Sequence, residues 1–210
     1  ELKLGEGSIQ QAIKEGIAIV YQELTLVPNM TVGENIFLGK EPTERGSINW
    51  NKLYNSTREI LHTYQLDVDP QAFVKDLGVG KMQMVEIAKA LSENAKILIL
   101  DEPTSALTEA EIGKLMDILR TLKNHGVTCI YITHKLGEFF RITDSVTVLR
   151  DGKTIITKPT SELTQEQLVS YMVGRKMKER FPRGNRKPGE TILEVKNLQA
   201  EDPGDSTHKV

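Results

Sequence analysis

Two adjacent acidic residues, Asp101 and Glu102, stand directly after the aliphatic run 97–100 and are followed by Pro103. Paired carboxylates at the carboxyl end of a strand lie where parallel sheets bind their ligands. Neighbouring residues of an extended chain face opposite sides, so Asp101 can hold Mg²⁺ while Glu102 aligns or deprotonates a water molecule. Many strands end in acidic turns that do no chemistry, and the pair taken alone is more often structural.

Two other polar residues follow buried-looking runs in the same way. His134 comes directly after the run 127–133, and Gln22 comes directly after the run 17–21. A single histidine in such a position is usually structural or simply exposed. If these strands are neighbours in one parallel sheet, their carboxyl ends share an edge, and the polar side chains converge on one crevice.

A glycine-containing stretch, Leu77-Gly78-Val79-Gly80-Lys81, leads into the helical pattern MQMVEIAKAL. Glycines at the start of a helix let bare backbone N–H groups and the positive end of the helix face an anion such as phosphate. The alternative is an ordinary loop that enters a helix. The glycines become informative through their position relative to the acidic pair.

Short β-rich runs alternate with helical periodicity, which predicts an α/β fold with a largely parallel sheet. The first three runs are apolar enough to predict strands buried on both faces. The four predicted strands are 17–21, 97–100, 127–133 and 146–149. Capping boxes predict helix starts at three hydroxyl residues, each followed three positions later by Glu or Gln, namely Thr31, Thr108 and Thr164.

The chain divides by composition into several segments. Residues 30–92 show mostly helical periodicity and predict a helical subdomain within a first domain that covers residues 1–173. Residues 174–190 are rich in Lys, Arg, Pro and Gly, as linkers are. Residues 191–210 open with a strand-like pattern and predict the start of a second domain. Asp151-Gly152 joins two β-like runs and predicts a hairpin.

Composition and charge exclude several classes of protein. The 210 residues are 39% hydrophobic and 27% charged, with 27 Lys and Arg against 29 Asp and Glu. A net charge of −2 gives no support for binding to nucleic acid. No aliphatic run approaches the roughly 18 residues that span a bilayer. The single Cys129 cannot form an internal disulfide and is predicted to be a small buried apolar residue.

In order, four segments resemble the Q-loop, signature, Walker B with D-loop, and H-loop of the ABC ATPases. They are IVYQE (19–23), LGVGKMQMVEIAKAL (77–91), ILILDEPTSALTEAE (97–111) and YITHKLGE (131–138). The resemblance covers essentially the whole chain and is strongest to the first half of the double ATPase subunits of sugar importers, such as those for D-xylose and ribose. It implies a P-loop-type ABC ATPase domain that uses ATP and Mg²⁺.

The resemblance also implies a role for each candidate residue. Asp101 would help bind Mg²⁺ together with Gln22, Glu102 would polarise the attacking water, and His134 would contact the γ-phosphate. Gln22 would also report the nucleotide state to a membrane subunit. The remaining nucleotide-binding positions would act on ATP held by an opposing ABC domain, and they are Gly78, Val79, Gly80, Lys81, Ser105, Ala106 and Leu107.

The chain departs from the family pattern in two places. Gly78, Val79 and Lys81 stand where a Ser, a Gly and a Gln are usual in the signature. Loss of the Ser hydroxyl removes a hydrogen bond worth roughly 1–3 kcal/mol to a charged acceptor. No phosphate-binding G-x-x-x-x-G-K-[ST] loop occurs, since the nearest string, 184–191, has Glu190 in place of the Lys and follows a linker. We therefore expect an N-terminally incomplete first domain that is inactive alone.

The implied partners are a permease, a second ABC domain of the same or another chain, and, indirectly, a periplasmic sugar-binding protein, with no nucleic acid. The implied location is peripheral, at the cytoplasmic face of the bacterial plasma membrane. Two alternatives remain open: an ABC ATPase that acts on ribosomes or DNA, and a truncated, non-enzymatic docking module. The slightly acidic charge counts against the first of these.

Overall fold

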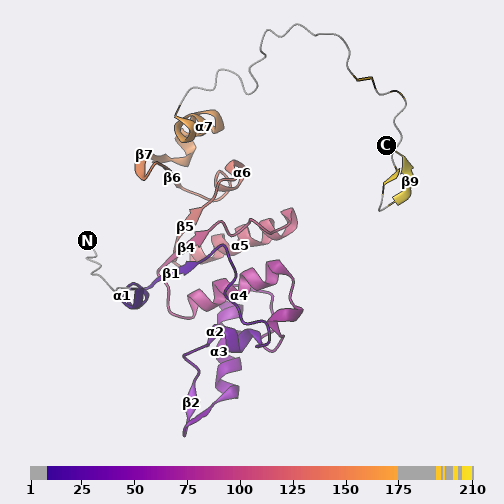
Figure 1. The fold of residues 1–210 in the computed structure, drawn as a ribbon. Coiled ribbons are helices and arrows are strands. Elements are labelled where there is room, and N and C mark those ends of the chain that lie inside the picture. The colour runs from indigo at the N-terminus through magenta and orange to yellow at the C-terminus, as the bar shows by residue number, and fades with distance from the viewer. Residues whose placement is uncertain (1–8, 175–192, 195, 197–200, 203–204, 210) are drawn as a thin grey trace. The chain divides into compact units, whose positions relative to one another are not determined.

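A three-stranded parallel sheet forms the centre of the fold. The computed structural model describes residues 9–174, 193–194, 196, 201–202 and 205–209. Strands β1 (Ile17–Val20), β4 (Ile97–Asp101) and β5 (Thr128–Ile132) pair in the order β1-β4-β5 (Figure 1). Ile19 lies opposite Ile99, which in turn lies opposite Ile130. The predicted α/β class and parallel sheet are confirmed.

Only one face of this sheet packs against the core, which corrects the expectation that the strands are buried on both faces. Leu98 and Leu100 of β4 have no exposed surface. On the opposite face Ile19, Ile130 and Ile132 remain 42–47% exposed. The runs are apolar, as predicted, but the described residues place no element over the second face that buries these isoleucines.

Helices α4 (Val79–Leu91) and α5 (Glu109–Asn124) cover the buried face of the sheet. The apolar residues of α4 and α5 repeat at helical spacing and pack with the strands in one core. Residues of α2 (Val32–Ile36) and of α3 (Trp50–Thr63) belong to the same core. The buried residues that these four helices contribute to this core are Val32, Ile36, Leu61, Val85, Ile87, Ala88, Leu91, Leu115, Ile118, Leu119 and Leu122. The same core therefore fixes the positions of the helices and of the strand ends.

The segment 30–92 is mostly helical but also contains a small hairpin, β2 (Thr43–Glu44) with β3 (Ser47–Ile48), which periodicity did not predict. Arg45 and Gly46 form its turn with positive φ angles. A two-residue strand is too short to show an alternating pattern. The other elements of the segment 30–92 are the helices α2, α3 and α4 and the short 3-10 helix η1 (Val74–Asp76).

The predicted capping boxes are present. The side chains of Thr31 and Thr108 each accept a hydrogen bond from the backbone N–H of the third residue of their helix. In both cases that residue is a Glu, and its carboxylate accepts from the backbone N–H of the Thr. Thr164 forms the corresponding pair with Gln167 at the start of α7 (Gln165–Val173). These caps satisfy backbone groups that a helix start otherwise leaves unpaired.

A second, smaller core lies in the later part of the chain. It consists of Phe139 from α6 (Leu136–Phe139), Val148 from β6 (Ser145–Arg150) and Leu168 from α7. Strand β7 (Lys153–Pro159) pairs antiparallel with β6, and η2 (Thr160–Glu162) follows it. Asp151 and Gly152 both have positive φ, which confirms the predicted hairpin turn.

Residue contacts separate the chain into two compact units, 1–173 and 174–210. The first unit begins, in its described part, with α1 (Ile9–Lys14). In the second unit, β8 (Glu201–Asp202) and β9 (Asp205–Lys209) form an antiparallel pair. The predicted linker beyond Gly174, the rejected string 184–191, and most of the strand-like pattern after residue 191 lie outside the described residues. Within the described part of the chain, no helix has the length and apolarity to cross a membrane.

Cys129 lies on β5, packs against the main core and is only partly exposed. Burial raises the pKa of its thiol to about 11, because a charged thiolate is poorly solvated there. Since the thiolate is the reactive species, this raised pKa makes Cys129 unreactive at neutral pH.

We expect iodoacetamide to alkylate Cys129 at about pH 8 roughly a hundredfold more slowly than a thiol of ordinary pKa. The rate should continue to rise about tenfold per pH unit up to about pH 10, because the native pKa lies above that range. Mass spectrometry of timed samples measures the rate, and the urea-unfolded chain provides the control. Rapid native alkylation at pH 8 would contradict the burial of this thiol.

Candidate functional site

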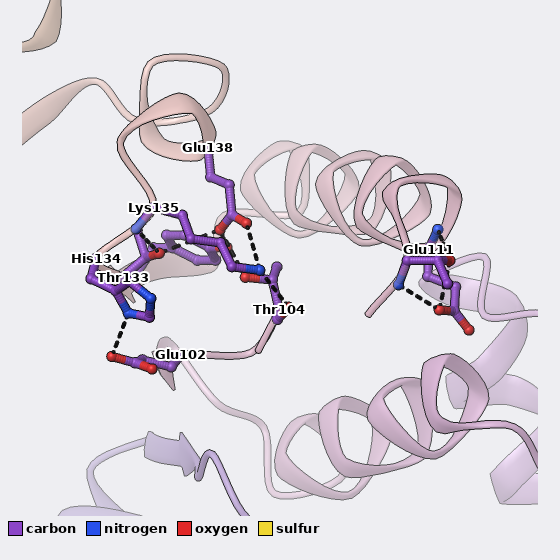
Figure 2. A network of polar contacts seen from close by, with 9 residues as sticks. Glu102, Thr104, Glu111, Thr133, His134, Lys135 and Glu138 are labelled. Atoms are coloured by element: carbon purple, nitrogen blue, oxygen red, sulfur yellow. Dashed lines mark hydrogen bonds and ion pairs between the residues drawn. The ribbon is translucent and has the colours of Figure 1, made fainter. Parts of the chain in front are cut away.

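The carboxyl ends of β4 and β5 bring Glu102 and His134 together. Asp101, the last residue of β4, pairs with Ile132, so the chain leaves both strands at the same edge of the sheet. The Glu102 backbone N–H donates to Ile132 O over 3.0 Å, and His134 Nδ1 lies 2.9 Å from Glu102 Oε1 (Figure 2). The predicted convergence of these two residues is confirmed.

The Glu102 backbone adopts the left-handed conformation, with φ of 43°. This region costs a non-glycine residue roughly 1–2 kcal/mol, and such residues persist where their surroundings over-determine them. The hydrogen bond to Ile132 supplies one such constraint, and a turn in which Ser105 N–H donates to Glu102 O over 3.2 Å supplies another. The Glu102 carboxylate is thereby presented to the exposed His134 ring.

Asp101 and Gln22 follow the same edge of the sheet without joining this pair. Val20 at the end of β1 pairs with Leu100, which places Gln22 just beyond the neighbouring strand end. Gln22 is exposed and Asp101 is half-buried. Among the residues that the structure describes, no three or more His, Cys, Asp or Glu side chains gather as a metal site. An ion here would need oxygen ligands from a bound molecule or water as well.

Behind the pair lies a buried polar network that sequence reasoning missed. Glu138 of α6 is buried, and its Oε2 accepts hydrogen bonds from the Thr104 and Tyr131 hydroxyls over 2.8 and 2.6 Å. Lys135 Nζ donates to the Thr104 carbonyl over 2.8 Å. Thr104 and Lys135 lie close in sequence to Glu102 and His134, and Glu138 ends the segment 131–138 that carries the family resemblance. These positions could have drawn attention to all three residues.

Tyr131 is held in its neutral form by this network. Burial raises the pKa of its phenol, and the hydrogen bond to Glu138 raises it further. A neutral hydroxyl can donate to the Glu138 carboxylate, while an ionised one cannot. Tyr131 therefore acts as a permanent donor at neutral pH.

The glycine-containing loop enters α4 as predicted. Gly78 is the N-cap residue and makes no side-chain cap, while Val79, the first helical residue, is 41% exposed. Lys81 is exposed as well. The start of this 13-residue helix thus presents backbone N–H groups, with the positive helix end, to whatever approaches from outside.

Gly80 faces inward, toward the helix that follows the acidic pair. A Cβ atom at this position would lie 2.8 Å from Glu111 Cδ, closer than side chains pack. Glu111 is the third residue of α5 and completes the capping box, since its carboxylate accepts from Thr108 N and Oγ1 over 2.9 and 2.8 Å. Those hydrogen bonds to the Thr108 backbone and hydroxyl lower the pKa of Glu111, with a smaller contribution from the Gly80 backbone.

The segment Ser105-Ala106-Leu107 connects the acidic pair to this cap. Ser105 and Ala106 are exposed, whereas Leu107 packs against the main core. Through Gly80 the glycine loop lies against Glu111, in the first turn of α5, the helix that follows this segment. No hydrogen bond between described residues joins the glycine loop to Glu102 or His134 directly. The structure thus forms one group from Glu102 and His134 and a second group from the glycine loop and the start of α5.

Replacement of Gly80 by Ala tests the close approach to Glu111. The added methyl group must displace the Glu111 carboxylate, so we expect Gly80→Ala to lower the free energy of unfolding by about 1–3 kcal/mol. Gly78→Ala is the control in the same loop, because nothing lies within 4 Å of its added Cβ, and its effect should be limited to the N-cap preference of less than about 1 kcal/mol. Urea unfolding measures both, and equal effects would contradict this contact.

Comparison with known proteins agrees with this arrangement. The family model described as ABC transporter matches residues 2–105. The chain is 57% identical over 195 residues to the xylose import ATP-binding protein XylG of Thermoanaerobacter pseudethanolicus, covering 93% of this chain and 39% of that protein. It is 48% identical over 191 residues to the galactose/methyl galactoside import ATP-binding protein MglA of Escherichia coli, covering 91% and 38%. The chain thus spans about two fifths of the length of these relatives.

Solved structures share the fold. The ATP-binding cassette MJ0796, in a dimeric post-hydrolysis state bound to ADP and Pi, superposes with a TM-score of 0.60 at 26% identity, covering 75% of this chain and 68% of that one. CbiO1 from Clostridium perfringens, part of the ABC transporter complex cbiONQ, superposes with a TM-score of 0.64 at 24% identity, covering 86% and 70%. The shared fold, the family match and an identity of about one half over nine tenths of this chain show that the chain belongs to the ABC transporter family.

Proposed function

We propose that the chain is part of the ATP-hydrolysing subunit that powers import of a sugar through an ABC permease. The observation that carries this proposal is the Glu102–His134 pair, joined over 2.9 Å at the carboxyl edge of a parallel sheet. The relatives described above are import ATP-binding proteins for xylose and for galactose and methyl galactoside, which supports a monosaccharide such as xylose.

In this proposal Glu102 polarises the water that attacks the γ-phosphate, and His134 contacts the same phosphate group. Their hydrogen bond fits these roles, because it orients the carboxylate that must align a water. The oxygen atoms of Asp101 and Gln22 are of the type that Mg²⁺ prefers, and both residues follow strand ends at one sheet edge. Bound Mg²⁺ would neutralise charge on the phosphates.

The second group of residues would act on a different nucleotide. We propose that Gly78, Val79, Gly80 and Lys81 contact ATP held by an opposing ABC domain. The exposed Gly78 and Val79 at the start of α4 support this role, since Gly78 makes no side-chain cap there. The segment Ser105-Ala106-Leu107 would lie across that domain interface, and the approach of Gly80 to Glu111 supports a coupling of the two segments.

The proposed domain plan places a first ABC domain at 1–173, with its helical subdomain at 30–92. The linker at 174–190 and the start of a second ABC domain at 191–210 complete it, and the separation of contacts after Val173 supports the first boundary. The second domain of the same or another chain would be the partner that completes the nucleotide site.

A permease would dock on the helical segment near residues 23–60. Leu38, Ile48 and Trp50 of this segment are 37–46% exposed, which supports contact with another protein. An open hollow beside the hairpin is lined by Glu44, Arg45, Ile48, Asn49, Trp50 and Asn51. Such docking would hold the subunit at the cytoplasmic face of the membrane, with a periplasmic sugar-binding protein as an indirect partner.

Nucleotide affinity in this proposal depends on a phosphate-binding loop that the printed sequence does not contain. That loop supplies a cradle of backbone N–H groups and a lysine for the phosphates. We therefore propose that the 210 residues alone bind Mg-ATP weakly and do not hydrolyse it.

Calorimetry with Mg-ATP tests the proposed function on the 210-residue chain and on a chain extended ahead of Glu1 by a segment with such a loop. We expect binding only by the extended chain, because only it holds both the phosphate cradle and the residues at the sheet edge. In the extended chain, Glu102→Gln should retain binding and reduce hydrolysis at least about a hundredfold, as expected for loss of the group that aligns the water.

Glu166→Gln on the exposed surface of α7 is the matched control and should hydrolyse ATP at the unmodified rate. Tight binding of ATP by the 210 residues would contradict the required cradle. Undiminished hydrolysis by the Glu102→Gln variant would contradict the role of the strand-end carboxylate.

A further inference from the structure

Glu138 is a buried carboxylate to which the proposed chemistry assigns no task. Its side chain is 8% exposed, and it lies on the short helix α6, four residues after His134. Burial of a carboxylate is unfavourable unless hydrogen bonds and a counter-charge replace the lost water. The partners of Glu138 therefore indicate what it holds in place.

The first set of partners ties Glu138 to the loop that follows Glu102. Glu138 Oε2 accepts from Thr104 Oγ1 over 2.8 Å, and Thr104 is only 1% exposed. Thr104 lies two residues after Glu102, within the turn that holds Glu102 in its left-handed conformation. The position of the Glu102 carboxylate thus depends on a side chain from a different element.

The second set of partners brackets His134. Thr133 Oγ1 donates to Glu138 Oε2 over 3.4 Å and accepts from the Lys135 backbone N–H over 3.0 Å. Lys135 Nζ lies 3.6 Å from Glu138 Oε1 and donates to the Thr104 carbonyl over 2.8 Å. Figure 2 shows these side chains meeting between the two loops, with the Glu102–His134 pair beside them.

His134 has little else to hold it. Its side chain is 66% exposed, and the hydrogen bond to Glu102 is the one side-chain hydrogen bond that the described structure gives its ring. Its ring position therefore follows from the backbone of Thr133 and Lys135, both of which contact Glu138. Tyr131, at the end of β5, adds a further hydrogen bond to the same carboxylate over 2.6 Å.

We propose that Glu138 is a positioning residue that holds the Glu102 loop and the His134 loop at the separation required for their hydrogen bond. It acts through Thr104 on one side and through Thr133 and Lys135 on the other. A carboxylate suits this task, because one of its oxygens accepts from several hydroxyls while its charge attracts the lysine. The positioning itself follows from the geometry, and its effect on ATP hydrolysis rests on the proposed function.

A merely structural role for Glu138 makes a different prediction. Loss of a buried polar group would then lower stability without a specific effect on the coupling between Glu102 and His134. The discriminating quantity is therefore that coupling, measured in chains that remain folded. A double-mutant cycle isolates it from the general effects of each substitution.

The experiment is proton–carbon NMR of the His134 ring in the 210-residue chain, which has four histidines to be assigned by single substitutions. Glu102→Gln should shift the ring signals, because it replaces the charged partner of Nδ1. In a Glu138→Gln background we expect this shift to fall at least about threefold, since the two loops are no longer held together. Glu138→Asp should show an intermediate reduction, and the exposed control Glu166→Gln should show none.

An unchanged effect of Glu102→Gln in a folded Glu138→Gln chain would overturn the proposal. If Glu138→Gln unfolds the chain, Tyr131→Phe removes one hydrogen bond while it keeps the ring, and the same shift should fall by a smaller factor. An unchanged shift there would overturn the proposal equally.

A second readout separates this inference from the proposed function. In the extended, ATP-binding chain, Glu138→Gln should lower kcat about tenfold and leave KM for ATP within about twofold, because the phosphate-binding loop supplies most of the ground-state affinity. Loss of the NMR coupling together with an unchanged kcat would contradict the ATPase role of the pair and leave the positioning role intact.

Discussion

The pairing of β4 with strands on both of its sides is the constraint on which the rest of the structure depends. Parallel pairing in register brings the carboxyl ends of β1, β4 and β5 to one edge of the sheet. Segments that are separated by about 80 residues between Gln22 and Glu102, and by about 30 between Glu102 and His134, thereby become neighbours. Without that register the 2.9 Å contact between Glu102 and His134 could not form.

The second constraint is the close contact between the glycine loop and the cap of α5. Gly80 has no side chain where the Glu111 carboxylate approaches, and the same carboxylate closes the capping box with Thr108. The start of α4 therefore lies against the cap that follows the segment Ser105-Ala106-Leu107.

The buried network around Glu138 contacts the loops that carry the half-buried Glu102 and the exposed His134, and its own groups are shielded from water. Burial of a carboxylate is costly, yet here each hydroxyl that contacts it belongs to a strand end or loop of the site. Such a network specifies one arrangement of two loops more sharply than apolar packing does, because the hydrogen bonds are directional. The left-handed backbone of Glu102 fits this account, since a strained residue requires surroundings that over-determine it.

The sequence by itself determined the α/β class, the three capping boxes, the hairpin at Asp151-Gly152 and the strand-end residues Glu102 and His134. Each follows from a local pattern: alternation of strands with helical spacing, a hydroxyl three residues before Glu or Gln, or a polar residue directly after an aliphatic run. Tertiary structure alone decided that one sheet face is left exposed at Ile19 and Ile130, that Gly80 meets Glu111, and that Glu138 joins Thr104 to the His134 loop. These features depend on contacts between residues about 30 or more positions apart, for which the local periodicity of a single sequence carries no signal.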